Sequence, residues 1–197
     1  MKNLTLILII FGFISCSNES ENKIEEPKED LTEAIEASES DIEISELDVT
    51  SQPILYIEEQ SKLDGDSIAM KLGKAYGEIM TFLGENKLEM TAAPMAITTE
   101  FSMEEMSWSF NAAIAVEIPE DIELTGRIKT GNTYEGKAVK AIHIGPYSES
   151  MKTYEALDKY VKQNNLEMNG QPWEEYVDDP TQVAEKDLKT FIYYPVK

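Results

Sequence analysis

The sequence contains one cysteine and one histidine among its 197 residues, which leaves little material for common metal or redox sites. Cys16 has no second cysteine with which to form an intrachain disulfide. A zinc site needs about four nitrogen, sulfur or carboxylate ligands, so the lone His143 excludes a histidine-rich site. Phosphate-binding glycine loops, Gly-x-Ser-x-Gly elbows and His-Glu-x-x-His motifs are absent as well. The sequence therefore predicts no metal and no cofactor, and it gives catalysis little support.

Basic residues are also scarce. Seventeen Lys and Arg face 38 Asp and Glu, a formal net charge of −21. Proteins that bind nucleic acid neutralise phosphates with Lys and Arg, so this composition argues against a nucleic-acid partner. An acidic surface attracts cations, although it also serves simply to keep a protein soluble.

No apolar run is long enough to cross a bilayer, which needs roughly 20 residues. The run at 4–14 is shorter and follows Lys2, a pattern typical of a signal peptide covering residues 1–15. It ends in Phe-Ile-Ser-Cys, which resembles a bacterial lipobox with Cys16 as the lipidated residue. Two or more acyl chains give stable membrane attachment. We therefore expect a lipid-anchored protein of the bacterial cell envelope, periplasmic or surface-exposed; the alternative is ordinary secretion with an incidental cysteine.

Aromatic residues are missing from residues 17–50, which hold 13 acidic side chains and two lysines, a net charge of −11. Such a segment buries too little apolar surface to offset its conformational entropy. Its charges repel one another and extend it. With Cys16 added, the sequence predicts a lipidated, disordered tether over residues 16–50.

Residues 51–197 have the length of one domain, and part of that domain is duplicated. Seven identities recur at an offset of 78 positions between residues 74–94 and 152–172: Lys74/Lys152, Tyr76/Tyr154, Asn86/Asn164, Leu88/Leu166, Glu89/Glu167, Met90/Met168 and Pro94/Pro172. This period is too long for a solenoid and predicts two half-domains, at about 51–125 and 137–197, related by a pseudo-twofold axis. Their seam is a natural place for a pocket.

Each half shows a strand, a helix and two further strands. Apolar residues at three-to-four spacing predict a helix over 66–85, for which the turn Asp64-Gly65-Asp66 offers an N-cap, and a helix over 149–164, capped by Ser148. Alternating patterns predict the strands 53–58, 95–101, 106–117, 137–144, 172–177 and 188–196, with a polar turn at 126–136. The order βαββ, twice, predicts an α+β fold: a mostly antiparallel sheet with two helices on one face and a central cleft.

The second half carries a resemblance to a known family. His143-Ile144-Gly145-Pro146-Tyr147 resembles the H-x-G-P-Y signature of the gyrase-inhibitor-like, or bacterial transcription-activator effector-binding, domain. The Gly-Gln-Pro at 170–172 and the final strand at 188–196 agree in order and spacing. The resemblance implies two units around a cleft that binds lipophilic, often cationic small molecules, while some members are reported as hydrolases. Many members have a cleft-facing glutamate at the position of Phe191, so this chain departs from the family there.

The residues that we expect to bind a ligand are mostly aromatic. Trp173 and Glu175 share one strand face and Glu174 and Tyr176 the other, so either carboxylate could supply the missing charge. We favour Glu175 because it aligns with Ile97 in the repeat. Trp108 and Phe110 are expected to pack beneath the helices, and His143 to be a hydrogen-bonded residue at a strand end. The predicted ligand-binding set is Tyr147, Trp173, Glu175, Tyr176, Phe191 and Tyr193.

Three functions follow as hypotheses. The first is a membrane-anchored binding module that captures a hydrophobic or amphipathic small molecule, cations included, in an aromatic cleft. The second is a protein-interaction module whose cleft is closed by its own side chains. The third is a small hydrolase that uses Glu174 or Glu175 with a tyrosine hydroxyl, for which the sequence shows no adjacent base and nucleophile.

Overall fold

The first strand lies earlier in the chain than the sequence predicts. The computed structural model describes residues 42–197, and β1 (Ile44–Val49) pairs antiparallel with β6 (Gly136–Ile144). These residues belong to the predicted tether of residues 16–50, so the tether prediction is wrong for them. The cause is tertiary: Ile44 packs on one face of the sheet and Val49 on the other, while β6 supplies the backbone hydrogen bonds. The signal peptide, Cys16 and the tether before residue 42 lie outside the described residues.

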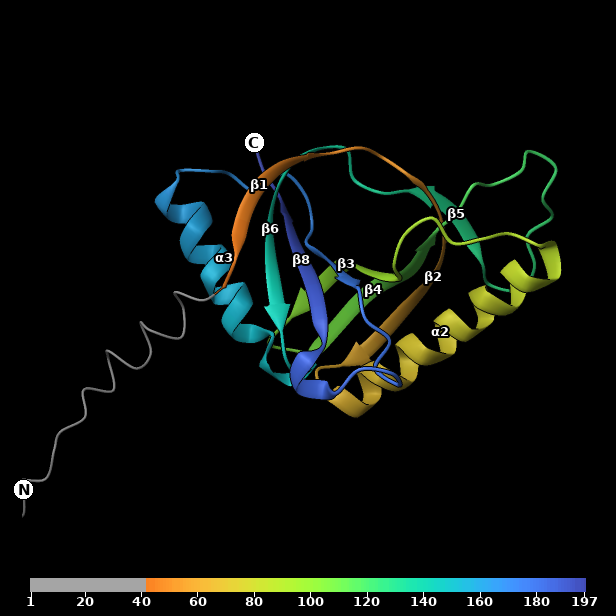
Figure 1. Cartoon of the computed structure of the whole chain (residues 1–197), viewed down its shortest axis with the longest axis horizontal. Coiled ribbons are helices and arrows are strands. Elements are labelled where there is room, and N and C mark those ends of the chain that lie inside the picture. The colour runs from red at the N-terminus through yellow and green to blue at the C-terminus, as the bar shows by residue number, and fades with distance from the viewer. Residues whose placement is uncertain (1–41) are drawn as a thin grey trace, which may run out of the picture.

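One eight-stranded sheet forms the centre of the structure, and all its strand pairings are antiparallel. Its spatial order is β1-β6-β8-β7-β3-β4-β2-β5, and its strands rotate progressively from one edge to the other (Figure 1). The remaining strands are β2 (Pro53–Lys62), β3 (Met95–Ser102), β4 (Ser107–Ala115), β5 (Lys129–Asn132), β7 (Trp173–Tyr176) and β8 (Lys189–Pro195).

The two halves exchange their outermost strands. Strands β2, β3 and β4 form the first half and β6, β7 and β8 the second, and β3 pairs with β7 where the halves meet. Strand β1 precedes β2 in the chain but pairs with β6 of the second half, and β5 precedes β6 but pairs with β2 of the first. Strand β5 lies within the segment 126–136, which the sequence predicts as a polar turn. A short polar edge strand has no apolar alternation by which it could be predicted. The exchange links the halves at both edges of the sheet.

Both helices cover the same face of the sheet, as predicted. Helix α2 (Gly65–Asn86) packs on β2 and β4, where Ile79 and Leu83 join a buried cluster with Phe110. Helix α3 (Met151–Gln163) packs on β6 and β8, where Leu157 contacts a second cluster that includes Ile192. Figure 1 shows α2 and α3 over opposite halves of the sheet. Within residues 42–197, no helix combines the length and apolarity needed to cross a membrane.

The repeat has a local structural cause at the helix ends. The Asn86 side chain donates to the carbonyl of Phe82, and the Asn164 side chain donates to that of Tyr160, both at 2.9 Å. The residue after each asparagine has a positive φ, 56° at Lys87 and 55° at Asn165, so the chain turns identically in both halves.

The helix starts differ between the halves. Asp64 Oδ1 accepts a hydrogen bond from the Ser67 backbone N–H at 2.9 Å, so the N-cap of α2 lies within the turn at 64–66 that the sequence predicts to supply it. In the second half, residues Tyr147–Glu149 form the 3₁₀ turn η1, and α3 begins only at Met151 without a side-chain cap. The predicted start of this helix at residue 149, capped by Ser148, is therefore wrong.

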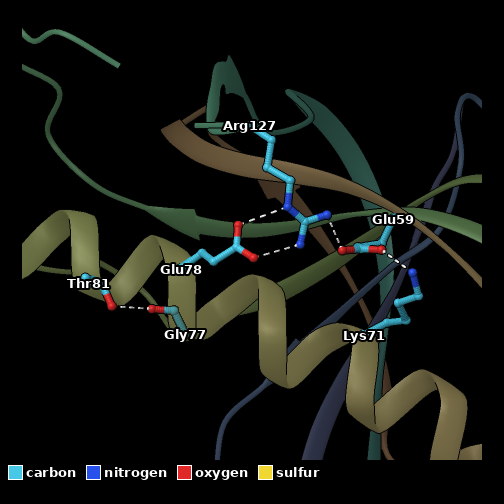
Figure 2. A network of polar contacts seen from close by, with 6 residues as sticks. All are labelled: Glu59, Lys71, Gly77, Glu78, Thr81 and Arg127. Carbon is cyan, nitrogen blue, oxygen red and sulfur yellow. Dashed lines mark hydrogen bonds and ion pairs between the residues drawn. The ribbon is translucent and has the colours of Figure 1, made fainter. Parts of the chain in front are cut away.

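An ionic network fastens the segment between β4 and β5 to the first half (Figure 2). The Glu59 side chain on β2 is only 4% exposed, and its two oxygens meet Arg127 and Lys71. Arg127 also forms two hydrogen bonds with Glu78 of α2, at 2.9 and 3.1 Å. Burial opposes ionisation of Glu59, but the hydrogen bonds from Arg127 and Lys71 outweigh it and hold its pKa below the ordinary value of 4.5.

Replacing Arg127 should destabilise the protein in a pH-dependent way. Folding lowers the pKa of Glu59, so the network stabilises the folded protein fully at pH values above 4.5, the ordinary pKa of the carboxyl group. This stabilisation is lost as the pH falls through the lower pKa that Glu59 has in the folded protein. We expect Arg127→Gln to lower the free energy of unfolding by about 1–3 kcal/mol at neutral pH, since Arg127 is partly exposed. Urea titration should show a smaller loss near about pH 3.

The matched control is Lys129→Gln, which breaks an exposed pair with Glu58 and should cost less than about 1 kcal/mol. Equal losses for Arg127→Gln at both pH values would contradict this account of Glu59.

Candidate functional site

A large cleft opens on the helix-covered face of the sheet, with a volume of about 1120 Å³. One wall is the inner side of α2 with the segment 90–94 after it, and the other is formed by Tyr147, Ser148, Ser150, Glu174 and residues 176–180. The cleft therefore lies at the seam between the halves, and its described lining includes Ile68, Leu72, Tyr76, Met80, Trp108, Tyr147, Glu174, Tyr176 and Thr190.

Strand register decides which side chains reach this cleft. Residues directly opposite one another in neighbouring strands point to the same face. Ala96, Glu174 and Ile192 form one such row, and Ile192 lies in the cluster beneath α3. The next row, one residue along each strand, is Ile97, Trp173 and Tyr193 and points to the opposite face. Glu174 therefore faces the cleft and Glu175 does not.

Glu174 is held by hydroxyl groups. The Tyr154 hydroxyl of α3 donates to its Oε1 and the Tyr176 hydroxyl of β7 to its Oε2, both at 2.6 Å. Burial, and then the negative charge of Glu174, raise the pKa of both tyrosines well above the ordinary value, so both stay protonated donors. No ion pair to Glu174 is formed within residues 42–197. The cleft thus contains a carboxylate that is held in place and that no basic side chain of the described residues neutralises.

Tyrosine rings surround the Glu174 carboxylate on the cleft side. Tyr176 makes edge contacts with Tyr76 on one side, at 6.5 Å between ring centroids, and with Tyr147 on the other, at 5.5 Å. Tyr147 is 41% exposed and lies at the cleft surface. Aromatic faces carry negative electrostatic potential, so rings around a carboxylate favour an organic cation.

Four of the six predicted ligand-binding residues lie on the opposite face of the sheet: Trp173, Glu175, Phe191 and Tyr193. Trp173 and Tyr193 stack at 4.5 Å with an angle of 5°, and the Tyr193 hydroxyl donates to Glu175 Oε2 at 2.9 Å. Lys140 Nζ lies 4.6 Å from the ring centroid of Phe191. The structure thus brings Tyr147 and Tyr176 into the cleft and gathers the other four in a separate aromatic cluster. Ligand binding by these residues stays a prediction.

Three residues of this site are not in the predicted ligand-binding set: Tyr76, Tyr154 and Glu174. Period-two alternation cannot tell which face of a strand is covered by helices, so it does not separate Glu174 from Glu175. The sequence predicts Tyr76 as part of the repeat and Tyr154 as part of the repeat and of a buried helical stripe. Their recurrence at the 78-residue offset was the available signal, because it places a tyrosine on each helix beside the seam.

The single histidine takes no part in the cleft lining. His143 is 1% exposed; its Nε2 lies 3.0 Å from the Pro146 carbonyl, and its Nδ1 lies 2.9 Å from Thr153 Oγ1. Since a carbonyl only accepts, Nε2 carries the hydrogen. The interpretation of His143 as a hydrogen-bonded strand-end residue is confirmed. Within the described part of the chain, no group of three His, Cys, Asp or Glu is placed to hold a metal ion.

Comparison with known proteins agrees with this geometry. Residues 42–197 match the family described as the GyrI-like small molecule binding domain. The chain belongs to this family. No match was found among curated proteins.

Solved structures share the GyrI-like fold. The EcmrR–DNA complex seen by cryo-electron microscopy superposes with a TM-score of 0.68 at 18% identity over 85% of this chain, which spans 63% of the EcmrR chain. A hydrolase encoded by lin2189 from Listeria innocua gives a TM-score of 0.57 at 17% identity, covering 79% of this chain and 92% of the other. SAV2435 bound to tetraphenylphosphonium gives 0.53 at 15% identity, covering 79% and 94%. At these identities the likeness shows the fold.

Removing one tyrosine hydroxyl should expose the dependence of Glu174 on its donors. Tyr154→Phe should lower the free energy of unfolding by about 1–3 kcal/mol, because a carboxylate loses a hydrogen bond while staying partly buried. The control, Tyr160→Phe, removes an exposed hydroxyl that lies 3.2 Å from Glu46 and should change stability by less than about 0.5 kcal/mol. Urea unfolding compares the two, and equal small effects would show that Glu174 is solvated and not held.

Proposed function

We propose that this chain is a membrane-anchored binding module that captures a hydrophobic or amphipathic organic cation in the cleft beside α2. The observation that carries the proposal is Glu174, a carboxylate held by two tyrosine hydroxyls in an aromatic cleft, with no ion pair formed to it within residues 42–197. A cation bound there would supply the missing opposite charge in a site of reduced dielectric. The tetraphenylphosphonium bound by SAV2435 is a ligand of this chemical class.

Binding is favoured over catalysis because the candidate catalytic side chains are already engaged in hydrogen bonds. Both oxygens of Glu174 already accept hydrogen bonds from tyrosines whose pKa burial raises, so neither hydroxyl is an activated nucleophile. The chain's one histidine is buried with both ring nitrogens engaged. Binding is also favoured over a closed protein-interaction module, because a cavity of about 1120 Å³ is of the size that holds a drug-sized molecule.

The envelope location rests on the sequence alone. A short apolar run after Lys2 and a lipobox-like string ending at Cys16 support export and lipidation. The part of the tether before residue 42 would then hold the cleft away from the membrane surface. Capture of cations there would serve sensing or sequestration in the envelope.

Charge removal at the two neighbouring glutamates tests which face of the sheet binds the ligand. We expect Glu174→Gln to weaken tetraphenylphosphonium binding by about tenfold or more, equivalent to about 1.4 kcal/mol, because the attraction between carboxylate and cation is lost. Glu175→Gln removes the same charge from the opposite face and should change the affinity by less than about twofold. Isothermal titration calorimetry measures both, and the reverse ranking would place the ligand on the opposite face.

The anchor is tested in a bacterial host by metabolic labelling with a radioactive fatty acid. The unaltered chain should be labelled and sediment with membranes, whereas Cys16→Ser should be unlabelled and remain in the soluble fraction. Ser15→Ala keeps a small residue before the cysteine and should behave like the unaltered chain. Membrane association of Cys16→Ser equal to that of the unaltered chain would contradict lipid anchoring at this residue.

A further inference from the structure

The two halves present equivalent tyrosines to the seam, but only one of them has a hydrogen-bond partner within the described part of the chain. Tyr76 on α2 and Tyr154 on α3 are separated by the 78-residue offset of the repeat. Tyr154 donates to Glu174 at 2.6 Å. The Tyr76 hydroxyl oxygen is buried, and no atom of residues 42–197 pairs with it. Glu174 is nevertheless close enough for its charge, after burial, to raise the pKa of Tyr76.

The repeat explains why Tyr76 lacks a partner. Subtracting 78 from 174 gives position 96, which is alanine in the first half. Ala96 on β3 is fully buried and lies directly opposite Glu174 of β7 in the strand register. The first half therefore has the hydroxyl donor, Tyr76, but no carboxylate acceptor at the position equivalent to Glu174. A buried hydroxyl without a partner is unfavourable, so a ligand group that pairs with it on binding gains affinity over a ligand that lacks such a group.

A second unpaired hydroxyl lies close by. Thr190 on β8 is 1% exposed, lines the same cleft, and its Oγ1 has no partner within the described chain. Thr190 stands directly opposite Tyr176 in the strand register, and Tyr176 contacts the ring of Tyr76. Both unpaired residues therefore neighbour Tyr176, one of the two tyrosines that donate to Glu174. Each can donate a hydrogen bond, while both Glu174 oxygens already accept one.

We infer that the ligand of this cleft is an organic cation that also carries a hydrogen-bond-accepting oxygen, and that Tyr76 donates to that oxygen with Thr190 beside it. The inference rests on the proposed function, because the cationic part must lie near Glu174. It adds a specificity that a purely hydrocarbon cation cannot satisfy. Tetraphenylphosphonium can pack against the tyrosine rings of the cleft but has no hydrogen-bond acceptor for the Tyr76 hydroxyl. The preferred ligand class is a cation with a carbonyl, ester or ether oxygen a few bonds from its charge.

A matched pair of probes measures how much the ligand's oxygen contributes to the affinity. (4-Oxopentyl)triphenylphosphonium and (4-methylpent-4-enyl)triphenylphosphonium carry the same permanent charge and nearly the same shape, and differ by a C=O in place of a C=CH₂ group; the carbonyl is not attached to the acidic carbon beside phosphorus, so both stay cationic at neutral pH. We expect the protein to bind the ketone about three- to tenfold more tightly than the alkene, the range that one net hydrogen bond supplies. In Tyr76→Phe the ratio should fall to about one, with the affinity for the alkene unchanged. Tyr160→Phe, which alters a tyrosine outside the cleft lining, should keep the ratio of the unaltered protein.

The outcomes separate the possible failures. A ratio near one in the unaltered protein, or a ratio that survives Tyr76→Phe, overturns the role of Tyr76. Loss of the ratio in Thr190→Val alone assigns the oxygen to Thr190 and also overturns it. If tetraphenylphosphonium binds without any preference for the ketone, the proposed function stands and this inference fails. If no phosphonium probe binds, both fail. Tyr76→Phe should unfold at a midpoint at least as high as the unaltered protein, because it loses no hydrogen bond, which excludes misfolding as the cause.

Discussion

The pairing of β3 with β7 is the constraint on which the rest of this structure depends. Only three residue pairs join the two strands, yet they connect the halves at the centre of the sheet. Because side chains alternate along a strand, a slip of one residue in this pairing would turn Glu174 away from the helices and bring Glu175 toward them. The exchanged strands β1 and β5 pair with the opposite halves at both edges of the sheet. The position of the cleft and the identity of its carboxylate both follow from this register.

The electrostatic character of the cleft follows from what surrounds Glu174. Buried carboxylates usually meet a basic side chain, as Glu59 meets Arg127 and Lys71 in the first half. Glu174 instead accepts hydrogen bonds from two tyrosine hydroxyls, which hold its orientation, and no basic side chain within residues 42–197 compensates its charge. The same protein thus contains one carboxylate that stabilises the fold and one that we propose pairs with an incoming cation. The difference lies in the partners, since both side chains belong to the same face of the sheet.

The architecture could be predicted from the sequence because it is encoded locally and twice. The asparagines at the helix ends, the apolar stripes and the duplicated βαββ order each report on nearby residues. Strand β1 could not be predicted, because its acidic composition is that of a disordered segment and its order comes from β6, about 90 residues away. Strand β5 could not be predicted either, because it is short and polar, lies at the edge of the sheet and is ordered by its pairing with the distant β2. The choice between Glu174 and Glu175 also depended on a long-range register, so the sequence could narrow the site to two residues but not to one.

A crystal structure of the protein with tetraphenylphosphonium tests the central claim most directly. The account predicts the phosphonium on the helix-covered face, beside Glu174, with its phenyl groups against Tyr176, Tyr147 and the inner side of α2. Density for the ligand against Trp173, Phe191 and Glu175 would contradict it. That result would move the binding site to the opposite face of the sheet and leave Glu174 as a structural group.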